Sequence, residues 1–203
     1  MRLKTLIAAA VLATTPMLAQ AESTFVNGAG NASANLDFQV IVPRILFLRV
    51  GTGTNFATNP AIDLISFNVP GASLGNGTPV AATAASGDLG NGAVTARVLG
   101  NGGNVTLTSA TLGALSNGAG GSISFGQINT AVTALASVPG APMPHPTLVD
   151  TGTGSTALTA TAGVVNRGAT WTYNYANSSV VASGSYGGQG VNNGRVTYTA
   201  ATP

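Results

Sequence analysis

Apolar and polar residues alternate along much of this chain, and the densest apolar stretch after its first 21 residues covers residues 34–51. In its first half every second residue is apolar, namely Leu36, Phe38, Val40 and Val42. A period of two predicts a strand with one buried face over residues 34–42. Pro43 cannot donate a hydrogen bond in a sheet and marks a strand start, an edge or a corner. The nearly continuous apolar run 45–50 predicts a second strand that is covered on both faces.

Shorter alternating runs continue to the C-terminus, at residues 61–69, 93–99, 104–109, 121–128, 156–165, 169–175, 179–186 and 195–200. Asn-Gly pairs separate many of them, at Asn76-Gly77, Asn91-Gly92, Asn101-Gly102, Asn117-Gly118 and Asn193-Gly194. Asn-Gly favours the positive φ angles of tight hairpins. Short strands at this rhythm predict an all-β sandwich or barrel. Residues 131–136 are the one segment expected to form a short helix, and residues 138–146, with four prolines, an extended crossing.

The first 21 residues have the layout of a secretory signal peptide. Arg2 and Lys4 precede an apolar stretch at residues 6–12, and Ala19-Gln20-Ala21 fits a cleavage site. The stretch is too short to span a bilayer, and no membrane span is expected elsewhere. We therefore expect a secreted chain with a flexible N-terminal extension at residues 22–33 and a single domain at residues 34–203.

Charge is scarce beyond the signal peptide. The 203-residue chain has a formal net charge of +2, but residues 22–203 carry five arginines and five carboxylates and no lysine. Without a basic stripe, no nucleic-acid partner is expected. Lysine commonly protects exposed sheet edges, and scattered charge opposes self-association. The absence of lysine and the scarcity of charge favour a protein whose sheet edges are occupied by a neighbour.

Residues that could carry chemistry are few. The chain has no cysteine, so its fold depends on burial and strand pairing rather than on disulfides. His145 is its one histidine, lies between two prolines and is expected to be an exposed loop residue. A single histidine and widely spaced carboxylates predict no metal site. The glycine-rich stretches lack a complete nucleotide-binding pattern, so no cofactor is expected.

A hydrolase motif was weighed against this background. Residues 71–75 read Gly-Ala-Ser-Leu-Gly, and Asp88 and His145 follow Ser73 in the order of a hydrolase triad. The motif requires a strand, a sharp turn and a helix, and no helix is expected there. We therefore predict no catalytic residues and no enzyme activity.

A cluster of aromatic residues offers an alternative function. Trp171, Tyr173 and Tyr175 share one face of the predicted strand 169–175. If this face is exposed it is a candidate binding face of a monomeric secreted carbohydrate- or surface-binding module. If it is buried, Trp171 is a core residue.

The export signal, the alternating residues Leu36, Phe38, Val40 and Val42, and the Gly/Asn/Thr-rich strands resemble bacterial chaperone–usher pilins. The likeness is to the archaic branch and to related spore-coat-U-like secreted proteins. It implies an immunoglobulin-like antiparallel β-sandwich that is completed by a strand of a neighbouring copy. It also implies export through the periplasm to the cell surface, with a periplasmic chaperone and an outer-membrane usher as partners.

Together these patterns predict a structural subunit of an extracellular fibre, pilus or surface coat. The subunit forms a homopolymer through its N-terminal strand, with Leu36, Phe38, Val40 and Val42 as the assembly residues. A self-contained sandwich that keeps residues 34–42 as its own strand is equally compatible with the sequence.

Overall fold

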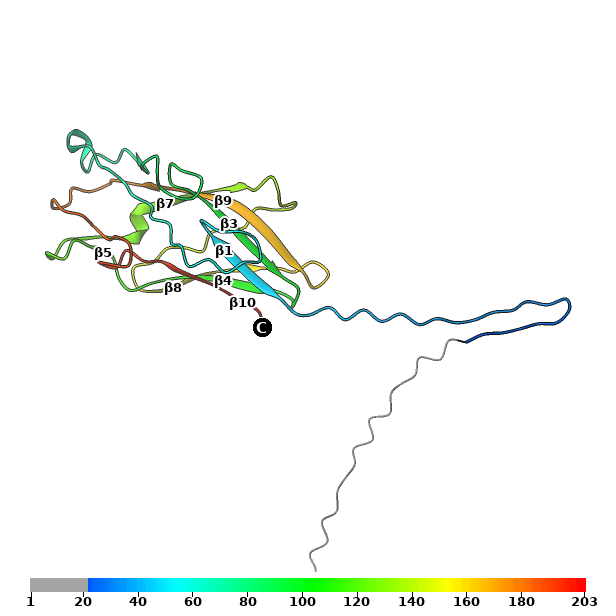
Figure 1. Ribbon diagram of the computed structural model, residues 1–203. Helices are drawn as coiled ribbons and strands as arrows, with labels where there is room; N and C mark the ends of the chain where they lie inside the picture. Colours follow the sequence, from blue (N-terminus) through cyan, green and yellow to red (C-terminus); the bar gives the residue numbers. More distant parts are fainter. Residues whose placement is uncertain (1–21) are drawn as a thin grey trace, which may run out of the picture. The chain divides into compact units, whose positions relative to one another are not determined.

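The computed structural model describes residues 22–203, so the expected signal peptide lies outside the described residues. Residues 43–203 form one compact unit, and the residues before Pro43 belong to a second unit. The compact unit therefore begins at Pro43 rather than at residue 34. It is nearly all β, and its sheets are antiparallel (Figure 1). None of the helices among residues 22–203 has the length and apolar character needed to cross a membrane.

Two larger sheets and one small hairpin make up the unit. The first sheet has the order β1-β3-β9-β2, with β7 also paired to β9, and the second has the order β10-β4-β8. The strands of the first sheet are β1 (Leu46–Val50), β2 (Val80–Ala81), β3 (Ala93–Gly100), β7 (Ile128–Ala134) and β9 (Val165–Tyr175). Those of the second are β4 (Val105–Thr111), β8 (Gly152–Leu158) and β10 (Thr197–Ala201). The hairpin pairs β5 (Leu115–Ser116) with β6 (Ser122–Ile123), and two short 3₁₀ helices occupy Gly71–Ser73 and Phe125–Gln127.

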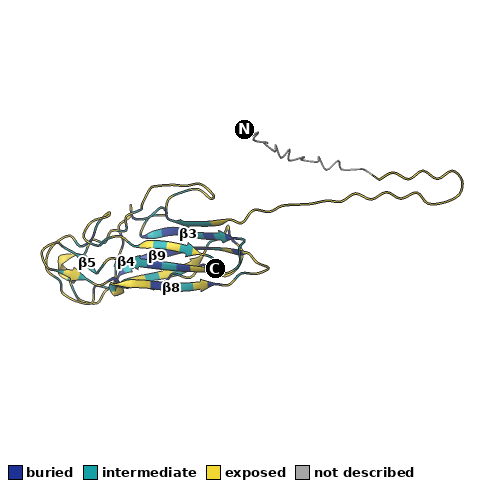
Figure 2. Cartoon of the chain, turned by 90° about the horizontal axis from the view of Figure 1, so that it is seen from below, coloured by how far each residue is buried: buried dark blue, intermediate teal, exposed yellow. Residues whose placement is uncertain are grey.

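One hydrophobic core lies between the two sheets, because alternate residues of their strands point toward each other. The buried residues of β3 and β9 face those of β4 and β8, and Figure 2 shows buried positions along β3, β9 and β4. Trp171 and Leu107 are fully buried at its centre. The core members are Val94, Ala96, Val98, Val105, Leu107, Met143, Leu158, Val165, Ala169, Trp171 and Tyr173.

Alternation predicted several of these strands. The runs 93–99, 104–109, 169–175 and 195–200 correspond to β3, β4, β9 and β10. The run 156–165 is divided between β8 and β9 by a turn with positive φ at Ala162 and Gly163. Of the five Asn-Gly pairs, Asn91-Gly92 alone has positive φ at both residues.

Several segments differ from the sequence-based expectation, among them residues 121–128, of which only Ser122–Ile123 and Ile128 are strand. The helix predicted at residues 131–136 is wrong, because these residues belong largely to β7, which pairs with β9 along its whole length. The run 45–50 forms the edge strand β1, whose residues are exposed or half-buried, so it is not covered on both faces. Residues 179–186 form no strand.

The proline-rich segment 138–146 is part of the connection that crosses from β7 in the first sheet to β8 in the second. It has no regular secondary structure, in agreement with the sequence, but it is packed into the molecule. Met143 is fully buried, and its carbonyl accepts a hydrogen bond of 2.9 Å from Trp171 Nε1. A Cβ atom at Gly168 would lie 2.8 Å from the Val138 side chain, so glycine permits this close approach.

Candidate functional site

An apolar groove lies at one end of the sandwich, lined by the end of β1, the start of β3, the end of β9 and the start of β10. β1 pairs only with β3, and β10 pairs only with β4, so each strand has one edge with no strand partner among the described residues. The two edge strands lie in contact with each other. A free edge presents unpaired backbone N–H and C=O groups that can accept another strand.

The groove has a volume of about 1000 Å³. One wall is formed by residues 61–69 and the other by residues 181–198, with Tyr173 and Tyr175 of β9 between them. Its size is at the upper end of the range for small-molecule pockets, but its two walls are long chain segments rather than a few converging side chains.

The wall at residues 61–69 was predicted to be a strand, but its backbone is largely unpaired. It makes a single isolated bridge, between Phe67 and Ala82. Ile65 and Phe67 contact the core, whereas Ile62 and Leu64 remain 49% and 48% exposed. This wall therefore presents apolar side chains and free backbone groups together.

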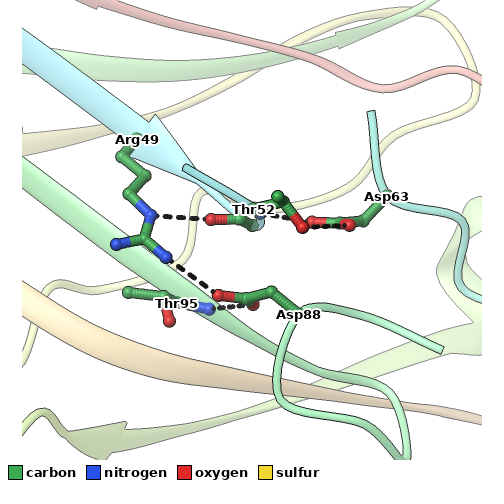
Figure 3. A network of polar contacts seen from close by, with 6 residues as sticks. Arg49, Thr52, Asp63, Asp88 and Thr95 are labelled. Carbon is green, nitrogen blue, oxygen red and sulfur yellow. Dashed lines mark hydrogen bonds and ion pairs between the residues drawn. The ribbon is translucent and has the colours of Figure 1, made fainter. Parts of the chain in front are cut away.

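One carboxylate fixes the start of this wall to the loop after β1, and a second links β1 to β3 (Figure 3). The Asp63 carboxylate accepts hydrogen bonds from the backbone N–H and the hydroxyl of Thr52. Asp88 forms an ion pair of 3.0 Å with Arg49 and also accepts a hydrogen bond of 2.7 Å from the N–H of Thr95. These contacts hold the loop between β1 and the wall in place, so the groove is a defined feature of the domain.

A single hydrogen bond joins the two walls across the groove among the described residues. Gln189 Nε2 donates to the carbonyl oxygen of Ile62 over 3.0 Å. The exposed Arg195 lies on the same wall as Gln189, and a Cβ at Gly190 would lie 3.0 Å from its Nη2. The guanidinium group thus rests against the turn that forms the rim of the groove.

A polar cluster lies beneath the groove. His145 Nε2 is 2.7 Å from the Tyr198 hydroxyl and 3.1 Å from the Tyr173 hydroxyl, and the two hydroxyls are 3.1 Å apart. Burial lowers the pKa of His145 to about 4 and raises that of Tyr173 to about 12. The histidine is therefore neutral at pH 7, and its Nε2 shares hydrogen bonds with the two tyrosine hydroxyls. The prediction of an exposed His145 was wrong, because its ring packs against Trp171 and its neighbour Pro146 is fully buried.

The predicted assembly residues lie outside the compact unit. Leu36, Phe38, Val40 and Val42 are 72%, 87%, 85% and 71% exposed, and no strand forms at residues 34–42. Figure 2 shows the whole of residues 22–42, here called the arm, as exposed. The alternation that predicts a strand is present, but the arm has no strand partner within the described chain.

The aromatic residues Trp171, Tyr173 and Tyr175 occupy one face of β9, as the alternation predicts, and that face is turned inward. They are 0%, 7% and 3% exposed. Trp171 is a core residue, whereas Tyr173 and Tyr175 form part of the groove lining. The Tyr175 hydroxyl is buried and has no hydrogen-bond partner among residues 22–203. The three rings thus do not form an exposed platform for a carbohydrate.

The residues of the hydrolase motif bind other partners. The Ser73 hydroxyl donates to the carbonyl of Pro70, Asp88 binds Arg49 and Thr95, and His145 binds the two tyrosines. Within residues 22–203 no group of three or more histidine and acidic side chains is placed to hold a metal ion. The groove itself was not found from the sequence, because it is a property of the space between segments 61–69 and 181–198.

Comparisons of the chain with protein-family models, with curated proteins and with solved structures found no match. The function is therefore inferred from the groove and the arm of this chain alone.

Proposed function

We propose that this chain is a structural subunit of an extracellular fibre, pilus or surface coat, built by β-strand addition. The arm of one copy lies as an extra strand in the groove of the next copy. In this assembly the domain is an immunoglobulin-like sandwich whose missing edge strand comes from a neighbour. The observation that carries the proposal is the coexistence of an unpaired apolar groove and an exposed strand-like arm in one chain.

The side chains of the arm suit the groove. In an extended chain Leu36, Phe38, Val40 and Val42 all point to one face, so all four can enter an apolar channel together. Burying four such side chains contributes about 6–12 kcal/mol. Association costs about 4–15 kcal/mol, so side-chain burial alone gives a weak complex. Backbone hydrogen bonds to the free edges supply the additional stabilisation.

The start of the domain favours insertion into a second copy. Asn101 Oδ1 accepts from the N–H of Ile45, and Asn101 Nδ2 donates to the carbonyl of Pro43. Arg44, between these two contacts, donates to Thr202 Oγ1 and to the carbonyl of Pro203. A chain held on both sides of Arg44 has no free turn by which residues 36–42 could reverse beside β1 of the same copy.

The composition of the chain supports self-association. Residues 22–203 have no net charge and no lysine, so neither long-range repulsion nor lysine on the edges opposes contact between copies. The resemblance to chaperone–usher pilins adds the expectation of a periplasmic chaperone and an outer-membrane usher during export.

Removing residues 22–42 tests the proposal. We expect the full-length mature chain to form oligomers or filaments, visible by electron microscopy and by sedimentation. The truncated chain should remain a folded monomer, because every core residue lies after Pro43. Its melting temperature serves as the folding control. Assembly that persists without the arm, or a mature chain that stays monomeric at all concentrations, would contradict the proposal.

A further inference from the structure

We propose that Asp37 in the arm of one copy forms an ion pair with Arg195 on the groove rim of the next copy, and so fixes the register of the inserted strand. This inference depends on the strand-addition function proposed above. It concerns only the partner of Asp37, so the ion pair can be absent even if strand addition takes place.

Residues 22–203 carry ten charged side chains, five arginines and five carboxylates. Eight of the ten make a hydrogen bond or an ion pair within the chain, namely Glu22, Arg44, Arg49, Asp63, Asp88, Arg97, Asp150 and Arg167. Asp37 and Arg195 have no such partner among the described residues. They have opposite charges, one lies in the arm and the other lies on the groove.

The alternation of side chains places both groups on the same face of the completed sheet. In the arm, Leu36 and Phe38 point into the groove, so Asp37 between them points outward. Along the wall, Tyr198 and Ala200 are half-buried against the core, whereas Thr197 and Thr199 are exposed. Arg195 is exposed and shares the phase of the two threonines. If β10 continues back to Arg195 when the strand is inserted and Asp37 lies directly opposite it, their Cβ atoms are about 4.5–5.5 Å apart, within the reach of an ion pair.

No other acidic group of the groove competes for Arg195. Asp63 is the one carboxylate in the groove lining. It belongs to the wall at residues 61–69, opposite Arg195, and it already accepts two hydrogen bonds from Thr52. The guanidinium group lies close to Gly190, where an added Cβ would be 3.0 Å from its Nη2. With no acidic group beside it among the described residues, its charge is available to a neighbour.

The ion pair determines the register of the inserted strand more than it raises the affinity between two copies. A shift of the inserted strand by one residue would turn the apolar side chains of the arm out of the groove. A shift by two residues keeps them inside but places Asn35 or Gln39 beside Arg195 in place of Asp37. An exposed ion pair adds little affinity, whereas like charges at the same place strongly disfavour the contact.

A charge-swap experiment on the full-length mature chain tests the inference. Asp37→Arg and Arg195→Asp should each raise the critical concentration for assembly about tenfold, measured by sedimentation at low salt. The double variant Asp37→Arg/Arg195→Asp should restore it to within about threefold of the original chain. At 1 M NaCl the differences between the variants should shrink, because the charges are screened.

The matched control is Glu22→Arg/Arg195→Asp. It has the same net charge as Asp37→Arg/Arg195→Asp, but it replaces Glu22, the other acidic residue of the arm, and keeps Asp37. It should assemble as poorly as Arg195→Asp alone. Rescue by this control, or no rescue by the Asp37 swap, overturns the inference. Circular dichroism melting checks that every variant is folded, which is expected because neither side chain makes a hydrogen bond in the monomer.

A second measurement uses the absence of cysteine in the chain. Asp37→Cys/Arg195→Cys should form a ladder of disulfide-linked oligomers under oxidising conditions, because opposite residues on paired strands meet the distance requirement. Asp37→Cys/Arg167→Cys should form none. Deletion of residues 22–42 separates the two claims. If the deletion abolishes assembly but neither the swap nor the ladder succeeds, the ion pair is wrong and strand addition stands; if the deletion leaves assembly intact, both are wrong.

Discussion

The two sides of this sandwich, where the edges of the two sheets come together, differ in how the chain covers them. On one side the connection from β7 to β8 closes the space between the sheets. The Met143 N–H donates to the carbonyl of Gly168 over 3.3 Å, and the Ser109 hydroxyl donates to the carbonyl of Thr147 over 2.9 Å. This segment needs no strand, because side chains and neighbouring backbone satisfy its polar groups.

At one end of the sandwich, residues 61–69 run from Asp63, which binds Thr52, to the bridge between Phe67 and Ala82, and a groove of about 1000 Å³ remains beside them. The Ser66 N–H donates to Ser86 Oγ and its carbonyl accepts from the Thr83 N–H, so the contrast with the closed side lies in the missing strand and the open groove. The same chain thus fills one side by itself and leaves the other without a strand. In the function proposed above, the arm of a neighbouring copy occupies this open region.

Removing the largest core residue should have the greatest effect on the monomer. Trp171→Ala leaves a cavity and removes the hydrogen bond to Met143, so we expect the free energy of unfolding to fall by about 3–5 kcal/mol in urea titrations. Trp171→Phe, which keeps most of the volume, should cost less. A loss below about 1 kcal/mol for the alanine variant would show that the closed side is not tightly packed.

The two sides can be compared directly with a pair of matched truncations. Met143→Ala on the closed side should lower the free energy of unfolding by about 2–5 kcal/mol. Leu64→Ala on the open wall, where the side chain is 48% exposed, should cost less than about 1 kcal/mol in the monomer. In the assembled state we expect Leu64→Ala to be the more damaging of the two. If the two substitutions lowered the free energy of unfolding of the monomer by the same amount, the two sides would not differ in packing.

Acid should destabilise the domain through His145. Its pKa is about 4 in the folded state and about 6.5 in the unfolded state. Between these values the unfolded chain binds more protons, so stability is complete above pH 6.5 and is lost as the pH falls toward 4. From pH 7 to pH 4.5 the expected loss from this residue is about 2–3 kcal/mol. His145→Gln should abolish that part of the pH dependence, and an unchanged pH profile would contradict the buried, neutral histidine.

The smallest effect is expected for the hydrogen bond that crosses the groove. A strand that enters between the walls must break the contact between Gln189 and Ile62, so Gln189→Ala should accelerate assembly by about threefold. Light scattering follows the rate, and the melting temperature of the monomer should hardly change. Slower assembly would mean that Gln189 instead contacts the inserted strand.

The sequence predicted those elements whose pattern and partner both lie within the domain. Residues 93–99 and 169–175 alternate and pair with each other as β3 and β9. Residues 131–136 have a weak pattern, and their pairing with β9 outweighed helix propensity. Alternation at residues 34–42 shows the capacity to form a strand, but a strand also requires a partner.

The candidate site was harder to predict than the strands. The alternation alone predicts Leu36, Phe38, Val40 and Val42 as assembly residues. The groove, the position of Arg195 and the cluster around His145 depend on how distant segments meet, which no local pattern records. The proline neighbours of His145 suggested exposure, although Pro146 is fully buried.

The most direct test of the central claim uses the truncated domain, residues 43–203, and a synthetic peptide of residues 22–42. Isothermal titration should show saturable binding with one peptide per domain, and a negative heat-capacity change from burial of apolar surface. A peptide carrying Phe38→Asp and Val40→Asp should not bind. If the unmodified peptide also fails to bind, or binds no better than the substituted one, the groove is not a site for the arm and the account is wrong.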